Sequence, residues 1–255
     1  MSSPKESLKT IDNFEKKENS LSADEENSSA LDSWRSWVVV VGSFLIVFNN
    51  FGQTYQWGVY QEHYIKYEFS GQANTQTISY IGTTSNAFMF VIGPFIGLVL
   101  QKIGFRGSMV LGTILCPLAL LLASFNTALW QLYLTQGVMF GFGNAFVFFP
   151  SMLLPNQWFN KYRGLATGIA VSGSGIGGLC LTPLARYIME NLGYRWCLRV
   201  NAMTCLVLLS IATILCRPRI SPPKKTWKSM KLFDRKLISF RLVLMFCYGT
   251  FACFG

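Results

Sequence analysis

The sequence has few charged side chains and a single histidine. Charged residues make up 13% of its 255 positions, about half of the roughly 25% that is typical of soluble domains. Hydrophobic residues make up 51%, and several apolar stretches reach the roughly 20 residues that a helix needs to cross a bilayer. This composition excludes an ordinary soluble domain and indicates an integral membrane protein.

Patterns that would support catalysis or metal binding are missing as well. We find no nucleophile–base spacing, no cluster of metal ligands and no phosphate-binding loop. The seven cysteines all fall in apolar segments, without the paired spacing of a metal site or a disulfide framework. We interpret them as small hydrophobic residues. The sequence therefore predicts no enzymatic activity, no cofactor and no metal site.

The net charge of +10 is distributed unevenly. Residues 1–36 hold 8 acidic and 5 basic side chains, and the rest of the chain has a net charge of +13. Most of these cations lie in alternate loops between the apolar runs, which is a pattern of membrane topology and excludes nucleic acid as a partner. With a cytoplasmic amino terminus, the predicted inner loops hold 13 basic residues and the outer loops hold 3. We therefore predict that orientation in the lipid bilayer.

The apolar runs predict six membrane spans and the beginning of a seventh. Residues 1–33 are polar, lack the apolar core of a signal peptide, and are predicted to form a disordered cytoplasmic tail. Residues 34–216 would form the six-helix transmembrane domain, and the nine basic residues of 217–241 a cytoplasmic linker. The seventh run, 242–255, is too short to cross and is predicted to be a truncated helix. The predicted spans are 37–58, 76–100, 108–125, 129–154, 164–187 and 196–216.

The second half of the first span is unusually polar. Exposing so many hydrogen-bonding groups to lipid would be costly, so they should face a watery cavity or a partner helix. The fourth span adds an asparagine and several phenylalanines. These residues could line a substrate path, or the phenylalanines could face lipid or a neighbouring helix. The predicted substrate-binding residues are Asn49, Gln53, Tyr55, Gln56 and Asn144.

Two further positions leave alternatives open. His63 follows Glu62 and is either a proton relay or a solvated residue of the first external loop, which is predicted over 59–75. Arg199 lies about one turn inside the sixth span. It either serves the function, or snorkels to the outer interface or pairs with Glu190.

Residues 158–178 read WFNKYRGLATGIAVSGSGIGG, a basic hinge followed by a run of glycines and small residues. The spacings Gly164-xxx-Gly168 and Gly173-xxx-Gly177 allow a second membrane helix to approach backbone to backbone. The whole stretch resembles the fifth-helix signature of the monocarboxylate transporter family, a branch of the major facilitator superfamily, and is closest to its fungal members. The matching positions are Phe159, Lys161, Arg163, Leu165, Ala166, Gly168, Ile169, Ala170, Gly173 and Gly177.

Two other motifs are similar to the same family. Residues before the first span fit its acidic–aromatic motif, and 97–106 resemble the tight turn between helices two and three. Gln101 stands where that turn has a carboxylate, and Tyr55 stands where many animal relatives carry a substrate-contacting lysine. The resemblance gives structural or gating roles to Asp32, Trp37, Gly97, Lys102, Gly104, Arg106, Lys161, Arg163, Gly168, Gly173 and Gly177.

The resemblance implies an all-α membrane protein with six helices arranged as two three-helix inverted repeats, the amino-terminal half of a major facilitator fold. It implies alternating-access transport of a small organic solute of the monocarboxylate type. It also implies symport with protons. The partners would be the solute, the bilayer, and a complementary carboxyl-terminal half or a second copy. The candidate locations are the plasma and vacuolar membranes. A transport-inactive remnant, or a regulatory partner of full-length relatives, is the alternative interpretation.

Overall fold

The computed structural model describes residues 34–68, 75–126 and 128–219, and all the regular secondary structure in this part of the chain is helical. Five stretches are long and apolar enough to cross a membrane: Ser36–Tyr67, Phe95–Ala123, Leu129–Trp158, Arg163–Leu192 and Tyr194–Leu215. The predicted all-α membrane class is thereby confirmed. The predicted tail, most of the basic linker and the seventh helix lie outside the described residues. The elements are α2 (Trp34–His63), a π-helix (Tyr64–Glu68), α3 (Thr75–Ala123), α4 (Leu129–Leu132), a second π-helix (Tyr133–Met139), α5 (Phe140–Trp158), α6 (Arg163–Leu192) and α7 (Tyr194–Leu215).

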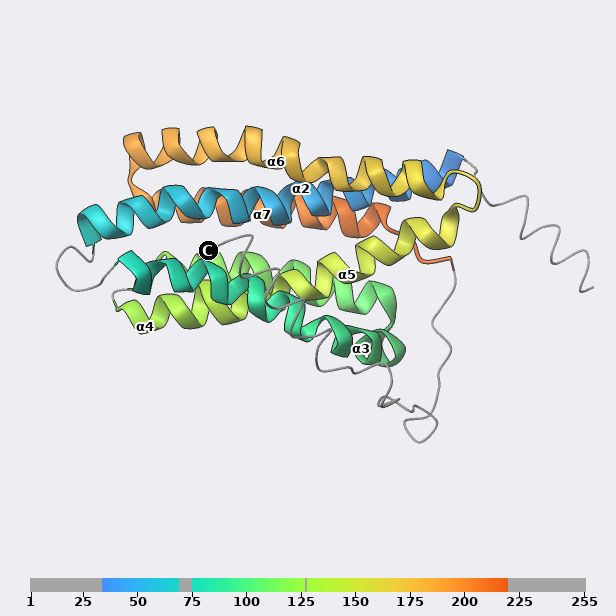
Figure 1. Ribbon diagram of the computed structural model, residues 1–255, viewed down its shortest axis with the longest axis horizontal. Coiled ribbons are helices and arrows are strands. Elements are labelled where there is room, and N and C mark those ends of the chain that lie inside the picture. Colours follow the sequence, from blue (N-terminus) through green and yellow to red (C-terminus); the bar gives the residue numbers. More distant parts are fainter. Residues whose placement is uncertain (1–33, 69–74, 127, 220–255) are drawn as a thin grey trace, which may run out of the picture.

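Helix α3 reverses direction at Gly104. Its 49 residues would extend ~74 Å as one straight helix, more than twice the thickness of a hydrocarbon core. Gly104 instead has φ 78° and ψ 170°, a conformation that glycine adopts far more readily than other residues. Both ends of α3 consequently reach the same π-helix: the Tyr133 hydroxyl donates to the carbonyl of Thr77, and the Asn126 amide donates to the Thr135 hydroxyl at 2.8 Å. Figure 1 shows the two arms of this hairpin.

The predicted external loop over 59–75 is wrong in its first part. Helix α2 continues to His63, and the chain stays helical to Glu68. The reason is packing that the local sequence does not reveal. Tyr60 and Tyr64 are buried, and the Tyr64 ring lies 6.5 Å from that of Tyr60 and 5.9 Å from that of Tyr194 on α7. These contacts hold the turn in a helix despite the polar residues between them.

Helices α5 and α6 end later than the sequence predicted. Helix α5 runs to Trp158, although we expected its end near residue 154. Helix α6 runs to Leu192, where we expected an end near residue 187, and Gly193 at φ 83° joins it directly to α7. Polar residues of the last turn of α6 are exposed, so they do not oppose helix formation. The loop between the fifth and sixth spans is therefore reduced to this glycine.

The close approach expected from the glycine spacing is present between α6 and α2. A Cβ atom at Gly173 would lie 2.6 Å from the carbonyl oxygen of Phe44, and one at Gly177 would lie 3.0 Å from the carbonyl carbon of Phe48. The two backbones therefore touch along this face, and Figure 1 shows α6 running beside α2. Gly164 and Gly168 differ, because nothing lies within 4 Å of a Cβ placed there.

Arg199 is held by α3 and by aromatic rings. Its guanidinium donates to the Ser124 hydroxyl at 3.2 Å and lies 5.1 Å from the ring centroids of both Phe125 and Trp196. The pairing with Glu190 that we considered is therefore wrong. Glu190 is an exposed residue of α6.

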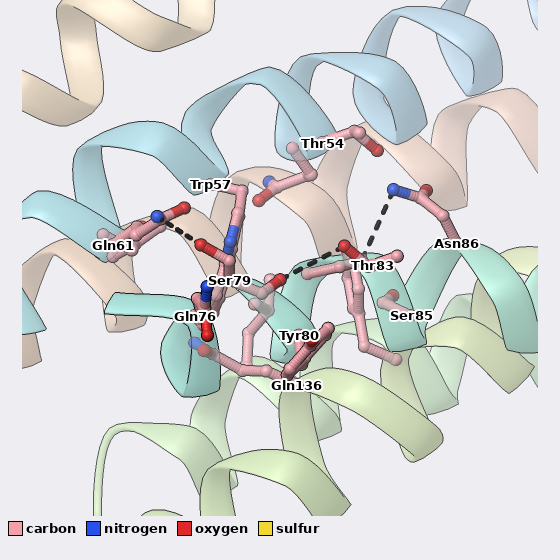
Figure 2. Close-up of a pocket in the computed structure, with 15 residues that line it drawn as sticks. Thr54, Trp57, Gln61, Gln76, Ser79, Tyr80, Thr83, Ser85, Asn86 and Gln136 are labelled. Carbon is pink, nitrogen blue, oxygen red and sulfur yellow. Dashed lines mark hydrogen bonds between the residues drawn. The ribbon is translucent and has the colours of Figure 1, made fainter. Parts of the chain in front are cut away.

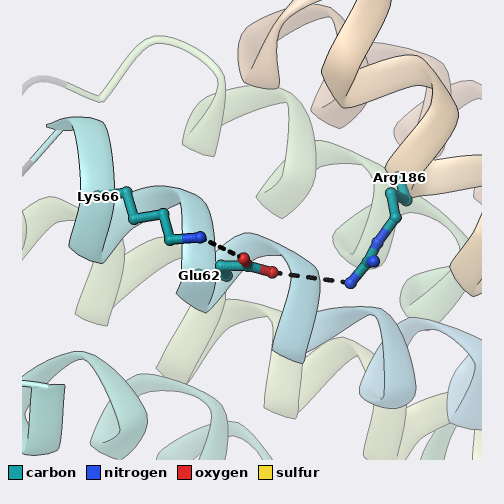
Figure 3. A network of polar contacts seen from close by, with 3 residues as sticks. All are labelled: Glu62, Lys66 and Arg186. Carbon is teal, nitrogen blue, oxygen red and sulfur yellow. Dashed lines mark hydrogen bonds and ion pairs between the residues drawn. The ribbon is translucent and has the colours of Figure 1, made fainter.

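A small ionic network joins the ends of α2 and α6. Figure 3 shows Glu62 between two cations, with Lys66 at 2.6 Å and Arg186 at 3.7 Å. The neighbouring His63 ring lies 5.0 Å from Tyr67 and 5.2 Å from Tyr194, so it is part of an aromatic group. The carboxylate and both cations are more than half exposed, so solvent screens the pairs.

Replacing Glu62 with glutamine is expected to change stability very little. The substitution removes both ion pairs but keeps the shape of the side chain, and exposed pairs contribute little. The midpoint of thermal unfolding in detergent should stay within about 2 °C of the wild type at physiological salt. A much larger decrease would show that this network, and not helix packing, holds α2 to α6.

Candidate functional site

A cavity of about 550 Å³ opens between α2 and the first arm of α3. Its other walls come from Leu120 in the second arm of α3, Gln136 in the second π-helix and Phe140 at the start of α5. Figure 2 shows the polar side chains that converge on it from these elements. The volume falls within the range of about 300–1,000 Å³ that is usual for pockets binding small organic molecules.

The polar lining consists mainly of carboxamides and hydroxyls, and none of the described lining residues carries a charged side chain. Several of these groups use only part of their hydrogen-bonding capacity within the described residues. Gln61 donates its amide to the Ser79 hydroxyl at 2.6 Å, and Gln136 accepts from the Tyr64 hydroxyl at 3.5 Å. The side-chain oxygen of Gln61 and the side-chain nitrogen of Gln136 remain available to a bound molecule. The lining carboxamides are Gln53, Gln61, Gln76, Asn86 and Gln136, and the aliphatic hydroxyls are Thr54, Ser79, Thr83 and Ser85.

Aromatic rings complete the lining. Trp57 from α2 reaches the backbone of α3, since a Cβ at Gly82 would lie 2.5 Å from the indole ring. Glycine is therefore required at this position for the tryptophan to pack here. The indole N–H is buried and has no hydrogen-bond partner among the described residues. The other rings of the lining are Tyr60, Tyr80 and Phe140.

A buried network of amides lies beside the cavity, between α2 and α7. Gln53 and Asn201 exchange two hydrogen bonds, each of 2.7 Å. The Asn201 amide also donates to the side-chain oxygen of Gln56 and, at 3.1 Å, to the Tyr60 hydroxyl. Gln56 in turn donates to the Leu181 carbonyl of α6 at 3.1 Å. The network thereby ties three helices together and holds Gln53 at the edge of the cavity.

The structure separates the five residues that we predicted to bind substrate. Only Gln53 lines the cavity. Asn49 donates to the Cys205 thiol at 3.2 Å, Gln56 belongs to the amide network, and Asn144 accepts from the Cys116 thiol at 3.3 Å. Tyr55 is 48% exposed and lies against Gly178 of α6. Apart from Gln53, substrate contact by these residues stays a prediction without support from the cavity.

The residues given structural or gating roles lie mainly at the helix ends. The Trp37 ring packs edge-on against Phe159 at 5.1 Å, Lys161 lies over the Tyr162 ring at 5.6 Å, and Arg163 donates to the Asn156 carbonyl at 2.8 Å. Asp32 lies outside the described residues. Gly97, Lys102 and Arg106 are exposed around the turn at Gly104.

Sequence reasoning missed most of the lining from α3 and the centre of the amide network. A periodic signal was present: residues 76, 79, 83 and 86 are all polar at spacings of three and four, which places them on one face of a helix. Asn201 lies between Cys197 and Cys205 at four-residue intervals, and all three are buried. An amide at the centre of such a face is a candidate for contact with another helix.

The described residues contain no group of three or more histidine, cysteine or acidic side chains that could hold a metal ion. The part of the cavity lining that the structure describes offers hydrogen bonds and ring contacts. This arrangement can bind an organic molecule between helices.

Comparison with known proteins identifies the family. The model of the Major Facilitator Superfamily matches residues 42–255. The chain is 33% identical over 217 residues to the MFS-type transporter pynF of Aspergillus niger, covering 85% of this chain and 50% of that protein. It is 32% identical over 229 residues to the probable transporter MCH2 of Saccharomyces cerevisiae, covering 88% and 48%. It is also 33% identical over 191 residues to the fujikurins efflux protein of Gibberella fujikuroi, covering 74% and 41%.

The chain thus spans about half the length of these curated relatives. They are named as transporters or efflux proteins, in agreement with the prediction that the chain is not an enzyme. The apolar helices and the family match together identify an integral membrane protein. The chain belongs to the major facilitator superfamily.

Proposed function

We propose that this chain supplies the amino-terminal half of a membrane carrier that moves a small organic solute by alternating access. The observation that carries the proposal is the polar cavity between α2 and α3 in a chain of this superfamily. Carriers of this kind hold the solute near the middle of the membrane, at the interface of two repeated units. The cavity would form this half's wall of that site.

The proposed half consists of six membrane crossings. The reversal at Gly104 divides α3 into two arms, and the arm 75–103 has 29 residues, enough to cross a bilayer. Together with α2, the second arm of α3, α4–α5, α6 and α7, this makes two sets of three helices in the proposed domain 34–216. We assign the two sets to inverted repeats. The cytoplasmic amino terminus, the basic linker 217–241 and the seventh helix from residue 242 belong to the same proposal.

The outer face of α6 is available to a complementary half. Gly164, Gly168 and Gly175 have nothing within 4 Å of a Cβ placed on them, whereas Gly173 and Gly177 are occupied by α2. Small residues on a membrane helix permit close approach by another helix. We propose that a second six-helix unit, from a longer chain or from another copy, packs here and closes the solute site.

Two classes of solute are candidates within this proposal. The fifth-helix motif resembles monocarboxylate transporters and favours a monocarboxylate with proton symport. The relative named as a fujikurins efflux protein favours a fujikurin-like solute instead. The plasma and vacuolar membranes are the proposed locations.

Cysteine labelling in membranes tests whether the cavity is open to water. Thr83→Cys should react with a membrane-impermeant thiol reagent, because Thr83 lines the cavity and its hydroxyl donates to the Ser79 carbonyl of its own helix. Asn144→Cys is the matched control and should not react above the background of the native chain, since Asn144 is 4% exposed. Equal protection at both positions would contradict a water-accessible solute site.

Uptake measurements then distinguish the proposed carrier function from that of a transport-inactive regulatory partner. The chain co-expressed with a complementary carboxyl-terminal half should give saturable uptake in vesicles, and that uptake should fall when Thr83→Cys is labelled. A regulatory partner would give no uptake in this arrangement but would alter uptake by a full-length relative. Saturable uptake by the monomeric chain alone would contradict the two-half mechanism.

A further inference from the structure

The cavity between α2 and α3 lacks charge on every wall that the structure describes. Its polar groups are carboxamides and hydroxyls, which are neutral and can each meet a donor or an acceptor. The acid nearest to it in sequence, Glu62, follows the lining residue Gln61. Figure 3 shows that the Glu62 carboxylate faces Lys66, one turn further along the chain, and Arg186 of α6. Its charge is therefore already paired with these two cations.

A carboxylate would be poorly accommodated by such a lining. Removing an ion from water is far more costly than removing a neutral hydroxyl or amide, unless an opposite charge compensates it. Among the described residues, the lining of the cavity supplies hydrogen bonds but no ammonium or guanidinium group. These walls therefore match an uncharged molecule better than an anion of the same shape.

The volume of the cavity and its aromatic lining residues further restrict the class of solute that fits. A volume of about 550 Å³ is in the range for drug-sized molecules and well above the needs of a three-carbon acid. Trp57, Tyr80 and Phe140 offer ring contacts from three elements, and the buried indole N–H of Trp57 has no acceptor among the residues that the structure describes. Figure 2 shows Gln61, Tyr80 and Gln136 around the same space.

We propose that this cavity takes an uncharged, ring-bearing organic solute with hydroxyl or amide groups, and discriminates against carboxylates. This substrate class rests on the proposed carrier function, and it opposes the monocarboxylate that the fifth-helix motif alone favours. The ring contacts Trp57 and Tyr80, and the free ends of the Gln61 and Gln136 carboxamides bond to polar groups of the solute.

Binding of two matched probes tests the substrate class. The probes are 4-hydroxybenzamide and 4-hydroxybenzoate, which share a ring and a hydroxyl and differ in charge. With the full purified chain in lipid nanodiscs, we expect calorimetry to give at least tenfold tighter binding of the amide. Thr83→Lys places an ammonium on the cavity wall and should shift the affinity ratio at least tenfold towards the benzoate.

Thr83→Met is the matched control, because it adds a chain of similar length without charge and should preserve the preference for the amide. A wild-type preference for the benzoate, binding of neither probe, or an unchanged ratio in Thr83→Lys would overturn the proposed class. Failure of the carrier function gives a different result. The amide would then bind with the expected preference, but no solute would cross the membrane even with the complementary half present.

Discussion

Replacing Gly177 with alanine is expected to force α6 away from α2 and to destabilise the helix bundle by about 3 kcal/mol. The added Cβ would collide with the backbone at Phe48, 3.0 Å from its carbonyl carbon and closer still to its carbonyl oxygen. A flexible side chain could move aside, but here the obstacle is the backbone of a membrane helix. The free energy of unfolding in detergent, measured by denaturant titration, should fall accordingly.

Gly175→Ala provides the control on the same helix. Nothing lies within 4 Å of a Cβ at Gly175, so its substitution adds no collision. Alanine also has a higher helix propensity than glycine, by up to about 1 kcal/mol. We expect this variant to match or slightly exceed the wild type in stability. If Gly175→Ala and Gly177→Ala destabilised the chain equally, the close packing of α6 on α2 could not explain the effect.

Replacing Asn201 with leucine is expected to lower the free energy of unfolding by about 2 kcal/mol. Leucine has a similar size but cannot form hydrogen bonds. Both ends of the Gln53 carboxamide bond to Asn201, so both would lose their partner. The Gln56 side-chain oxygen also loses its donor, but the Gln56 amide keeps the Leu181 carbonyl and the Tyr60 hydroxyl keeps the Cys197 thiol, so each contributes less to the loss than Gln53.

A double substitution tests whether the amide pair causes this loss. In Asn201→Leu with Gln53→Leu, the orphaned carboxamide is removed together with its partner, and most of the lost stability should return. Thr204→Val is the control on α7, because the Thr204 hydroxyl bonds only to the Val200 carbonyl of its own helix at 3.0 Å. Its expected cost is below about 1 kcal/mol. Additive losses in the double variant would contradict a coupled pair.

The polar residues of α2 show which part of the candidate site can be predicted from the sequence. Their clustering at 49–56 correctly indicates that they avoid lipid on one side of a helix, and helical periodicity places Asn49, Gln53 and Gln56 on one face. Periodicity does not reveal what lies opposite that face. Asn201, 148 residues further along the chain from Gln53, fills it. Most of these amides therefore join helices, and the cavity lies towards α3 instead.

The ends of the helices likewise depend partly on local sequence and partly on contacts between distant residues. The polar residues around Glu62 predicted a loop, but buried contacts of Tyr64 with Tyr60 and Tyr194 keep that segment helical. Conversely, the turn expected around Gly104 occurs there, because the positive φ is a local property of glycine.

The sequence by itself determined that the chain is helical, lies in a membrane and carries the motifs of its superfamily. Apolar length, charge distribution and glycine spacing are local properties that can be counted along the chain. Only the tertiary structure decided which amides bond to one another, which glycines of α6 touch α2, and where an uncharged cavity remains. Those outcomes depend on which faces of distant helices meet, and helical periodicity specifies a face without specifying its partner.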